Sequence, residues 1–276
     1  MRCPDPRSVV AGTLLVLFTG LAAANPEVTR TAITERFQRD FPALSPADYA
    51  LGAAAFDAEL RAQVEANAGA AQAAGVVEAG KKVALRKFKN GRTIAGCFPN
   101  GGKRIAATYP QYDSRLKRIV TLETAVNQCL KTHNEPLLDP ADTEMATLTA
   151  YLRSLSDQQK IAVRIPTAAN EKFEEGRRLY FTRLGQRNYA CATCHVQGAG
   201  KRYDDLPLSP ALGQATHWPI YRDAKPVTLQ ARIRECLERM GAAPFAAGSD
   251  ELNHIELFLT YLSNGMPLRA NAWRSR

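Results

Sequence analysis

The clearest chemistry in this 276-residue sequence lies in five consecutive residues. Residues 191–195 read Cys-Ala-Thr-Cys-His, a CxxCH motif. Its two thiols lie about one helical turn apart and can add to the two vinyl groups of a haem, while the adjacent imidazole reaches the iron. A CxxC redox pair or a zinc site with a chance histidine is the alternative, but the sequence holds no second CxxC. The motif therefore predicts one covalent haem c, attached at Cys191 and Cys194, with His195 as an iron ligand.

The second axial ligand of the iron is left open by the residues that follow the motif, which are His217, Cys236, Met240, His254 and Met266. Methionine is the usual choice in electron-transfer haems, which favours Met240 or Met266. Cys236 is the unusual choice, and Arg232 precedes it by four residues on the same helical face. A cation there would stabilise a thiolate and attract an anion. We favour Cys236, partly because of the resemblance described below.

The N-terminus predicts export from the cytoplasm. Arg2 and Arg7 precede an apolar run at 9–18, and three alanines at 22–24 form a signal peptidase site. A membrane anchor is the alternative, but the run is shorter than the ~20 residues that span a bilayer. We expect cleavage after Ala24, which makes residues 1–24 a signal peptide. The mature chain is then expected in the periplasm, with no membrane span.

The composition indicates a folded protein, with 45% apolar and 23% charged residues. The net charge of +9 suits an anionic partner or substrate. The basic residues form short pairs, such as Lys81-Lys82 and Arg177-Arg178, and no dense run. We therefore expect no nucleic-acid partner.

The two halves of the chain resemble each other loosely. Aromatic-Pro-x-Tyr occurs at 109–112 and 218–221, Thr-Leu-x6-Cys-Leu at 121–130 and 228–237, Gly-Lys-Arg at 102–104 and 200–202, and Tyr-Leu at 151–152 and 261–262. Leu122, Val126 and Cys129 share one face at the helical period, and the second copy repeats this pattern. We expect a mainly α fold with two cytochrome c-like domains, at 25–156 and 157–276, of which the second alone binds haem.

The cysteines that the haem does not use need another explanation. Cys3 leaves with the signal peptide, and Cys97, Cys129 and Cys236 remain in an oxidising compartment. Cys97 lies where the first half would carry a haem motif, and Cys129 matches Cys236 in the repeat. We predict a Cys97–Cys129 disulfide in place of a lost haem. Two separate buried thiols are the alternative.

Taken together, these residues resemble the A subunits of the SoxAX cytochromes, which are L-cysteine S-thiosulfotransferases. The resemblance covers nearly the whole mature chain. It rests on the two cytochrome-like halves, on the single CxxCH in the second half, and on the Arg-x3-Cys pattern from Arg232 to Cys236. Some members of this family carry a haem in each half. This sequence lacks the first CxxCH and therefore resembles the single-haem type.

The resemblance implies a role for each matching residue. Cys236 would be the distal iron ligand and the reacting sulfur, in some members a persulfide, and Arg232 would bind the anionic substrate. The implied reaction joins thiosulfate to a cysteine of the carrier protein SoxYZ and passes two electrons to a cytochrome c. A smaller subunit, SoxX, would supply a second haem. A plain electron carrier with His/Met ligation and a structural haem subunit whose partner performs catalysis are the competing functions.

Overall fold

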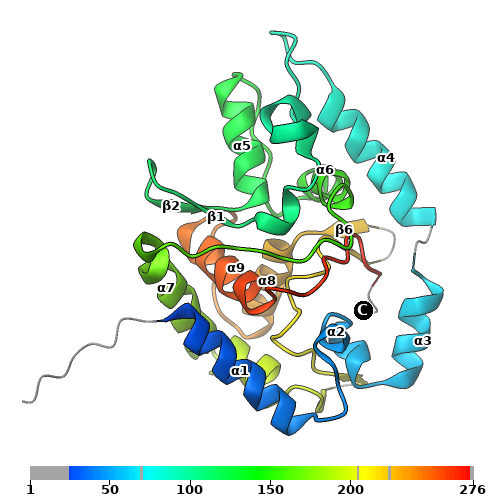
Figure 1. Ribbon diagram of the computed structural model, residues 1–276, viewed down its shortest axis with the longest axis vertical. Helices are drawn as coiled ribbons and strands as arrows, with labels where there is room; N and C mark the ends of the chain where they lie inside the picture. The colour runs from blue at the N-terminus through cyan, green and yellow to red at the C-terminus, as the bar shows by residue number, and fades with distance from the viewer. Residues whose placement is uncertain (1–24, 69–70, 204, 223–224, 274–276) are drawn as a thin grey trace, which may run out of the picture.

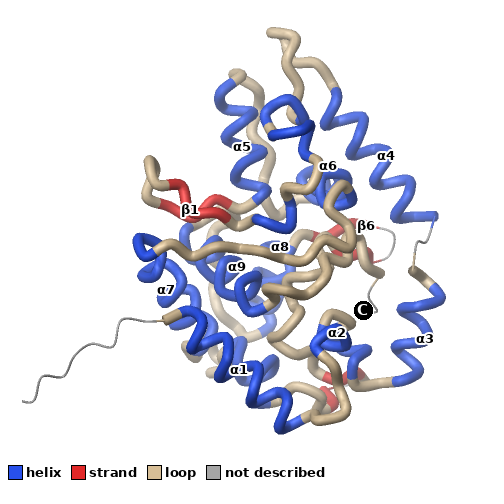
Figure 2. Tube along the Cα trace, in the orientation of Figure 1, coloured by secondary structure: helices blue, strands red, loops and turns tan. Residues whose placement is uncertain are grey.

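The computed structural model describes residues 25–68, 71–203, 205–222 and 225–273. These residues form a mainly α fold (Figures 1 and 2), as predicted. The helices are α1 (Pro26–Asp40), α2 (Pro46–Tyr49), α3 (Ala58–Ala66), α4 (Ala71–Leu85), α5 (Leu122–Thr132), α6 (Thr143–Ser154), α7 (Asn170–Phe181), α8 (Leu229–Arg239) and α9 (Asp250–Leu262). The short antiparallel hairpins are β1 (Gln111–Asp113) with β2 (Arg118–Val120), β3 (Arg202–Tyr203) with β4 (Leu206–Pro207), and β5 (Ile220–Arg222) with β6 (Lys225–Val227).

Two helix pairs form the centre of the two halves, α4 against α6 and α7 against α9. A glycine allows each close approach. A Cβ on Gly80 would lie 2.1 Å from the carbonyl oxygen of Thr147, and one on Gly176 would lie 2.0 Å from that of His254. Any larger residue at either glycine would push the paired helices apart.

Helices α5 and α8 begin in the same way, each directly after a hairpin. Thr121 caps α5 by accepting the N–H of Thr124, and Thr228 caps α8 by accepting the N–H of Ala231. Such caps satisfy backbone donors that the first helical turn leaves unpaired. Both helices are 11 residues long. The peptide bonds before Pro110 and Pro219, which precede the hairpins, are both cis.

The N-terminal helices pack differently from our expectation, which placed residues 25–156 in one domain. Ile33, Phe37 and Tyr49 belong to the same hydrophobic core as Phe173 and Trp218 of the second half. In Figure 1, α1 lies alongside α7, and contacts between these two helices agree with the view. The periodicity of α1 reveals an apolar face but does not identify the surface that covers it. The compact core of the first half consists of residues from 84 to 152.

A buried polar cluster joins the two halves. The Arg153 Nη2 atom of α6 lies 3.7 Å from Oε1 of Glu123 and 3.8 Å from Oε1 of Glu256. The residues of this cluster are at most 5% exposed. Gln230 of α8 donates to Glu256 at 3.2 Å and to Asn253 at 3.0 Å. The cluster thus places one cation between two acidic side chains, one from each half.

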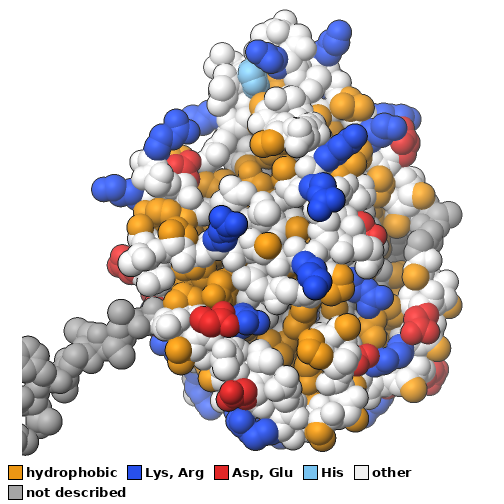
Figure 3. Space-filling view, in the orientation of Figure 1, with side chains coloured by type: hydrophobic (Ala, Val, Ile, Leu, Met, Phe, Trp, Pro, Cys, Tyr) orange, Lys and Arg blue, Asp and Glu red, His pale blue; other side chains and the backbone are white. Residues whose placement is uncertain are grey.

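Among the described residues, no helix is both long enough and apolar enough to cross a membrane. The predicted signal peptide at 1–24 lies outside the described residues. Lys and Arg side chains are spread over the face shown in Figure 3 and do not gather in a single patch there.

Candidate functional site

The CxxCH motif lies on a single turn that continues from Cys191 into the π-helical segment η6 (Thr193–Gln197). The Thr193 hydroxyl accepts the backbone N–H of Ala190 at 3.1 Å and so fixes the start of this turn. Cys191, Cys194 and His195 are half-buried, and Ala192 between them is buried in the core. The turn therefore places two thiols and one imidazole together at the edge of the core.

His195 is held through one of its two ring nitrogens. Its Nδ1 lies 2.9 Å from the carbonyl oxygen of Ser209 and donates to it, which leaves the lone pair of Nε2 available. The Ser209 hydroxyl and the Gln214 amide also lie near Nδ1, at 3.1 and 3.4 Å. Burial lowers the pKa of His195, and the charge of Arg232 lowers it further. A neutral imidazole with a fixed tautomer is the form in which histidine binds iron.

Helix α8 supplies the other two candidate residues of the site. Leu229, Ile233 and Leu237 bury one face of the helix. Arg232 and Cys236, one turn apart, are half-buried beside this face. Arg232 Nη1 lies 2.9 Å from Oε2 of Glu235 in an ion pair.

The cysteines of α8 and of the CxxCH turn are electrostatic neighbours. Burial, followed by the charge of Cys236, raises the pKa of Cys191 to about 12. The same two causes raise the pKa of Cys194. Tyr180 of α7 also interacts with all three thiols, and burial is the main cause of its raised pKa. The structure therefore brings Cys191, Cys194, Cys236 and Tyr180 into one cluster.

The other candidate iron ligands also lie in the second half, and each has contacts of its own. Met240 ends α8, and its carbonyl oxygen accepts the N–H of Arg187 at 3.1 Å. Met266 is buried, and its backbone pairs with Ile161. The ring of His217 packs on Trp218 at 5.3 Å. His254 lies where α9 crosses Gly176. Cys236 as the distal ligand remains a prediction.

Three residues around His195 were not found from the sequence. Tyr180 donates to the Gln214 side chain at 3.1 Å, and Gln214 and Ser209 lie at the His195 ring. They come from α7 and from the loop after η6. Neither spacing nor residue type marks them, because tyrosine, serine and glutamine are common in folded chains.

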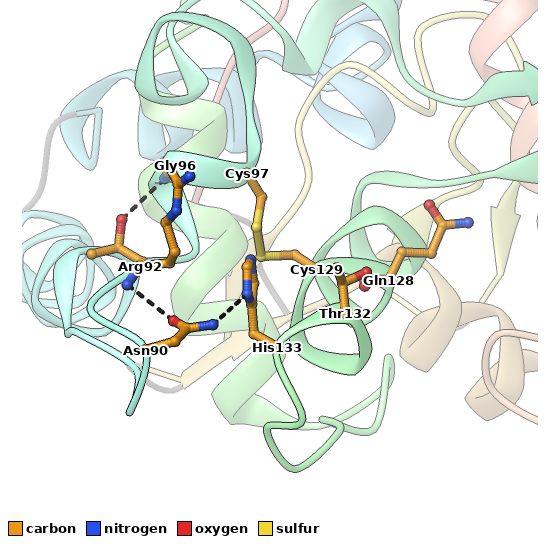
Figure 4. The surroundings of a disulfide bond; sticks show 9 residues. Asn90, Arg92, Gly96, Cys97, Gln128, Cys129, Thr132 and His133 are labelled. Carbon is orange, nitrogen blue, oxygen red and sulfur yellow. Dashed lines mark hydrogen bonds between the residues drawn. A yellow bond between two sulfur atoms is a disulfide. The ribbon is translucent and has the colours of Figure 1, made fainter.

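In the first half, the structure joins Cys97 and Cys129 in a disulfide (Figure 4). Cys97 comes from the short turn η2 (Ala95–Cys97) and is exposed, whereas Cys129 lies on α5 and is buried. Their Cα atoms are 6.0 Å apart, within the range for disulfides. The bond ties the turn before η3 (Pro99–Gly102) to helix α5.

Removing this disulfide is expected to destabilise the first half. Cys97→Ser should lower the free energy of unfolding by about 2–4 kcal/mol, because the unfolded chain regains the freedom of a closed loop with a sequence separation of 32. Chemical denaturation of the wild type, of Cys97→Ser and of the double variant with Cys129→Ser would measure this change. The haem spectrum should stay nearly constant. An unchanged denaturation midpoint would contradict the prediction.

The domain is mainly α, holds CxxCH on one turn and fixes Nδ1 of the histidine with a carbonyl oxygen. These features define a c-type cytochrome domain that binds haem c. The family model for the SoxA/TsdA cytochrome c domain matches residues 82–161 and 175–268. The chain belongs to this family.

Curated relatives extend the likeness to the whole chain. The L-cysteine S-thiosulfotransferase subunit SoxA of Chlorobaculum tepidum is 34% identical over 99% of this chain and 100% of its own length. The protein of the same name from Allochromatium vinosum is 34% identical over 94% of each chain. The crystal structure of SoxXA from P. pantotrophus is similar at a TM-score of 0.68 and 27% identity, and covers 74% of this chain and 79% of that chain.

Proposed function

We propose that the chain is the haem-carrying A subunit of a periplasmic L-cysteine S-thiosulfotransferase, which conjugates thiosulfate to a cysteine of a SoxYZ-type carrier. The observation that supports this most directly is the position of Cys236 and Arg232 on one helix beside the CxxCH turn. The full-length relatives named for this activity support the same proposal.

The donor set fits one haem c. Cys191 and Cys194 would form the thioethers, Nε2 of His195 would bind the iron, and Cys236 would approach it from α8. When bound, the haem supplies one-electron redox chemistry. We further propose that the two halves arose from one repeated unit and that the first half has lost its haem. The paired caps, helix crossings and hairpins support the repeat, and the Cys97–Cys129 disulfide supports the loss.

The haem content gives a direct test of this assignment. Purified periplasmic protein is expected to contain one haem per polypeptide, because one CxxCH is present. A pyridine haemochrome assay combined with the protein concentration gives the ratio, and the intact mass reports covalent attachment. A ratio of two would overturn the single-haem proposal.

The proposed reaction converts a carrier thiol and thiosulfate into a disulfide-linked conjugate. In balanced form, RSH and S2O3²⁻ give RS–SSO3⁻, one proton and two electrons. The electrons pass to an acceptor cytochrome c, and a SoxX-type subunit provides a second haem. Cys236 acts as the reacting sulfur, and the cation of Arg232 binds the thiosulfate dianion. Glu235 pairs with the same guanidinium at 2.9 Å, so a dianion that binds there competes with this ion pair.

A reconstituted reaction tests the proposal. It contains this chain, a SoxX-type partner, the carrier, thiosulfate and cytochrome c. The mass of the carrier should rise by one thiosulfate group as the acceptor is reduced. Acceptor reduction without a change in carrier mass would contradict the proposed conjugation.

Arg232→Ala should lower kcat/KM for thiosulfate by about tenfold to a hundredfold, because a charge-assisted contact contributes on the order of 1.5–3 kcal/mol. The haem content should not change. Arg239→Ala is a matched control, since Arg239 lies in the last turn of the same helix and is exposed. Equal losses in both variants would show that net charge, and not the position of Arg232, captures the substrate.

A further inference from the structure

A second group of potential metal donors lies around the disulfide of the first half. Sγ of Cys97, Sγ of Cys129 and a ring nitrogen of His133 all lie within 4.8 Å of one another. We propose that reduction of this disulfide by a dithiol converts the three residues into a metal site for one thiophilic divalent cation of the Zn²⁺ class. This site is separate from the haem-binding residues and does not depend on the proposed transferase activity.

Helix α5 positions two of the three donors. Cys129 and His133 are four residues apart and therefore share one face of the helix. His133 is the C-terminal cap of α5, and its backbone N–H bonds to the carbonyl oxygen of Cys129 at 3.2 Å. Helix α8 has the same arrangement, with Cys236 inside the helix and Met240 as its cap. Both helices thus place a pair of potential metal ligands at their C-terminal ends.

The imidazole of His133 is held in place beside the sulfurs (Figure 4). Nδ2 of Asn90 donates to Nδ1 of His133 at 2.8 Å, and the Asn90 side-chain oxygen accepts the N–H of Arg92 at 3.1 Å. The Phe88 ring packs on the imidazole at 5.3 Å. Because Nδ1 accepts this hydrogen bond, it carries a lone pair, and a metal ion bound there would take the place of the Asn90 amide hydrogen.

The electrostatics and accessibility also fit a cation. The C-terminal end of a helix carries partial negative charge, so a cation beside Cys129 and His133 is favoured. Exposed Cys97 is the sulfur that an external thiolate can attack, and buried Cys129 is the leaving group. Two thiolates and one imidazole suit Zn²⁺, and the exposed side leaves room for water as a fourth ligand.

The chemistry balances with a dithiol as the reductant. The dithiol attacks Cys97, becomes a cyclic or linked disulfide, and leaves Cys97 and Cys129 as two thiols. Two electrons therefore move from the dithiol to the protein disulfide. Binding of Zn²⁺ then replaces two thiol protons, so affinity should rise with pH.

The test uses the full haem-loaded chain, either oxidised or reduced with dithiothreitol and desalted without oxygen. Zn²⁺ binding is measured by equilibrium dialysis and metal analysis, and alkylation of Cys97 and Cys129 is followed by mass spectrometry. We expect one more Zn²⁺ per chain in the reduced form. Zn²⁺ should also protect both thiols from iodoacetamide, and a chelator should reverse this protection.

Two variants separate this site from other sulfurs. The Cys97→Ser/Cys129→Ser double variant retains Cys236 and should lose the additional Zn²⁺. His133→Gln should bind Zn²⁺ at least ~10-fold more weakly, since even the indirect partners of a metal ligand contribute 10–100-fold. Circular dichroism checks that the reduced first half stays helical. Equal Zn²⁺ binding by the oxidised and reduced proteins, by the double variant, or by His133→Gln would overturn the proposal, as would unfolding on reduction that Zn²⁺ does not reverse.

Discussion

Cys236→Met is expected to keep a six-coordinate haem spectrum and yet lose thiosulfate conjugation by at least about a thousandfold. Methionine sulfur can bind iron, but it carries no exchangeable proton and cannot act as a reacting thiolate. Removal of a nucleophile commonly costs several orders of magnitude in rate. Cys236→Ala should lose both the reaction and the sulfur ligand. Absorption spectra of the variants and the mass of the carrier measure the two effects separately.

The same pair of variants distinguishes the competing functions. Met240 lies four residues after Cys236 and could serve an electron carrier with His/Met ligation. Met240→Leu is therefore the matched control, with spectrum and activity expected to stay as in the wild type. If Cys236→Met conjugated thiosulfate at the wild-type rate, Cys236 would have no chemical role in the reaction. Full conjugation by Cys236→Ala as well would place catalysis on the partner subunit.

Arg153→Met should lower the free energy of unfolding by about 3–5 kcal/mol, because it leaves the acidic side chains of Glu123 and Glu256 buried without their cation. The effect should appear in chemical denaturation at neutral pH. Arg164→Met is the control, since Arg164 is exposed and the substitution is the same. A loss below about 1 kcal/mol would mean that the cluster is not structurally important.

The cluster should also make stability depend on pH. Burial, followed by the charge of Glu123, raises the pKa of Glu256 from 4.5 to about 8. The folded protein therefore keeps a proton that the unfolded chain releases above pH ~4.5, so the free energy of unfolding falls as pH rises toward about 8. Glu256→Gln should flatten this slope. A slope equal to that of the wild type would contradict the role of Glu256.

The sequence predicted most of what is local in this fold and little of what depends on distant contacts. Helices α5 and α8 follow from the apolar period of Leu122, Val126 and Cys129 and from its repeat in the second half. The CxxCH turn follows from its own spacing. The packing of α1 on the second half does not follow, because an amphipathic helix can cover any apolar surface. Ser209 at the His195 ring depends in the same way on tertiary structure.

The buried cluster around Arg153 could not be predicted from the sequence either. Glu123 and Glu256 lie on helices with ordinary amphipathic patterns, and a charged residue is expected on the surface unless a partner covers it. Glu123 and Gln230 occupy the same place after the paired Thr-Leu motifs, so the repeat predicts their similar position in each half. It does not predict that Arg153 of one half meets Glu256 of the other.

The N-terminal helices have a practical consequence for dissecting the molecule. A fragment cut at the predicted boundary, residues 157–276, would lack Ile33, Phe37 and Tyr49 and would expose the apolar surface that they cover. It would also contain Glu256 without the guanidinium of Arg153. Expression of this fragment should therefore give aggregated or poorly haem-loaded material. A minimal unit would have to rejoin residues 26–66 to the second half, as in a circularly permuted gene.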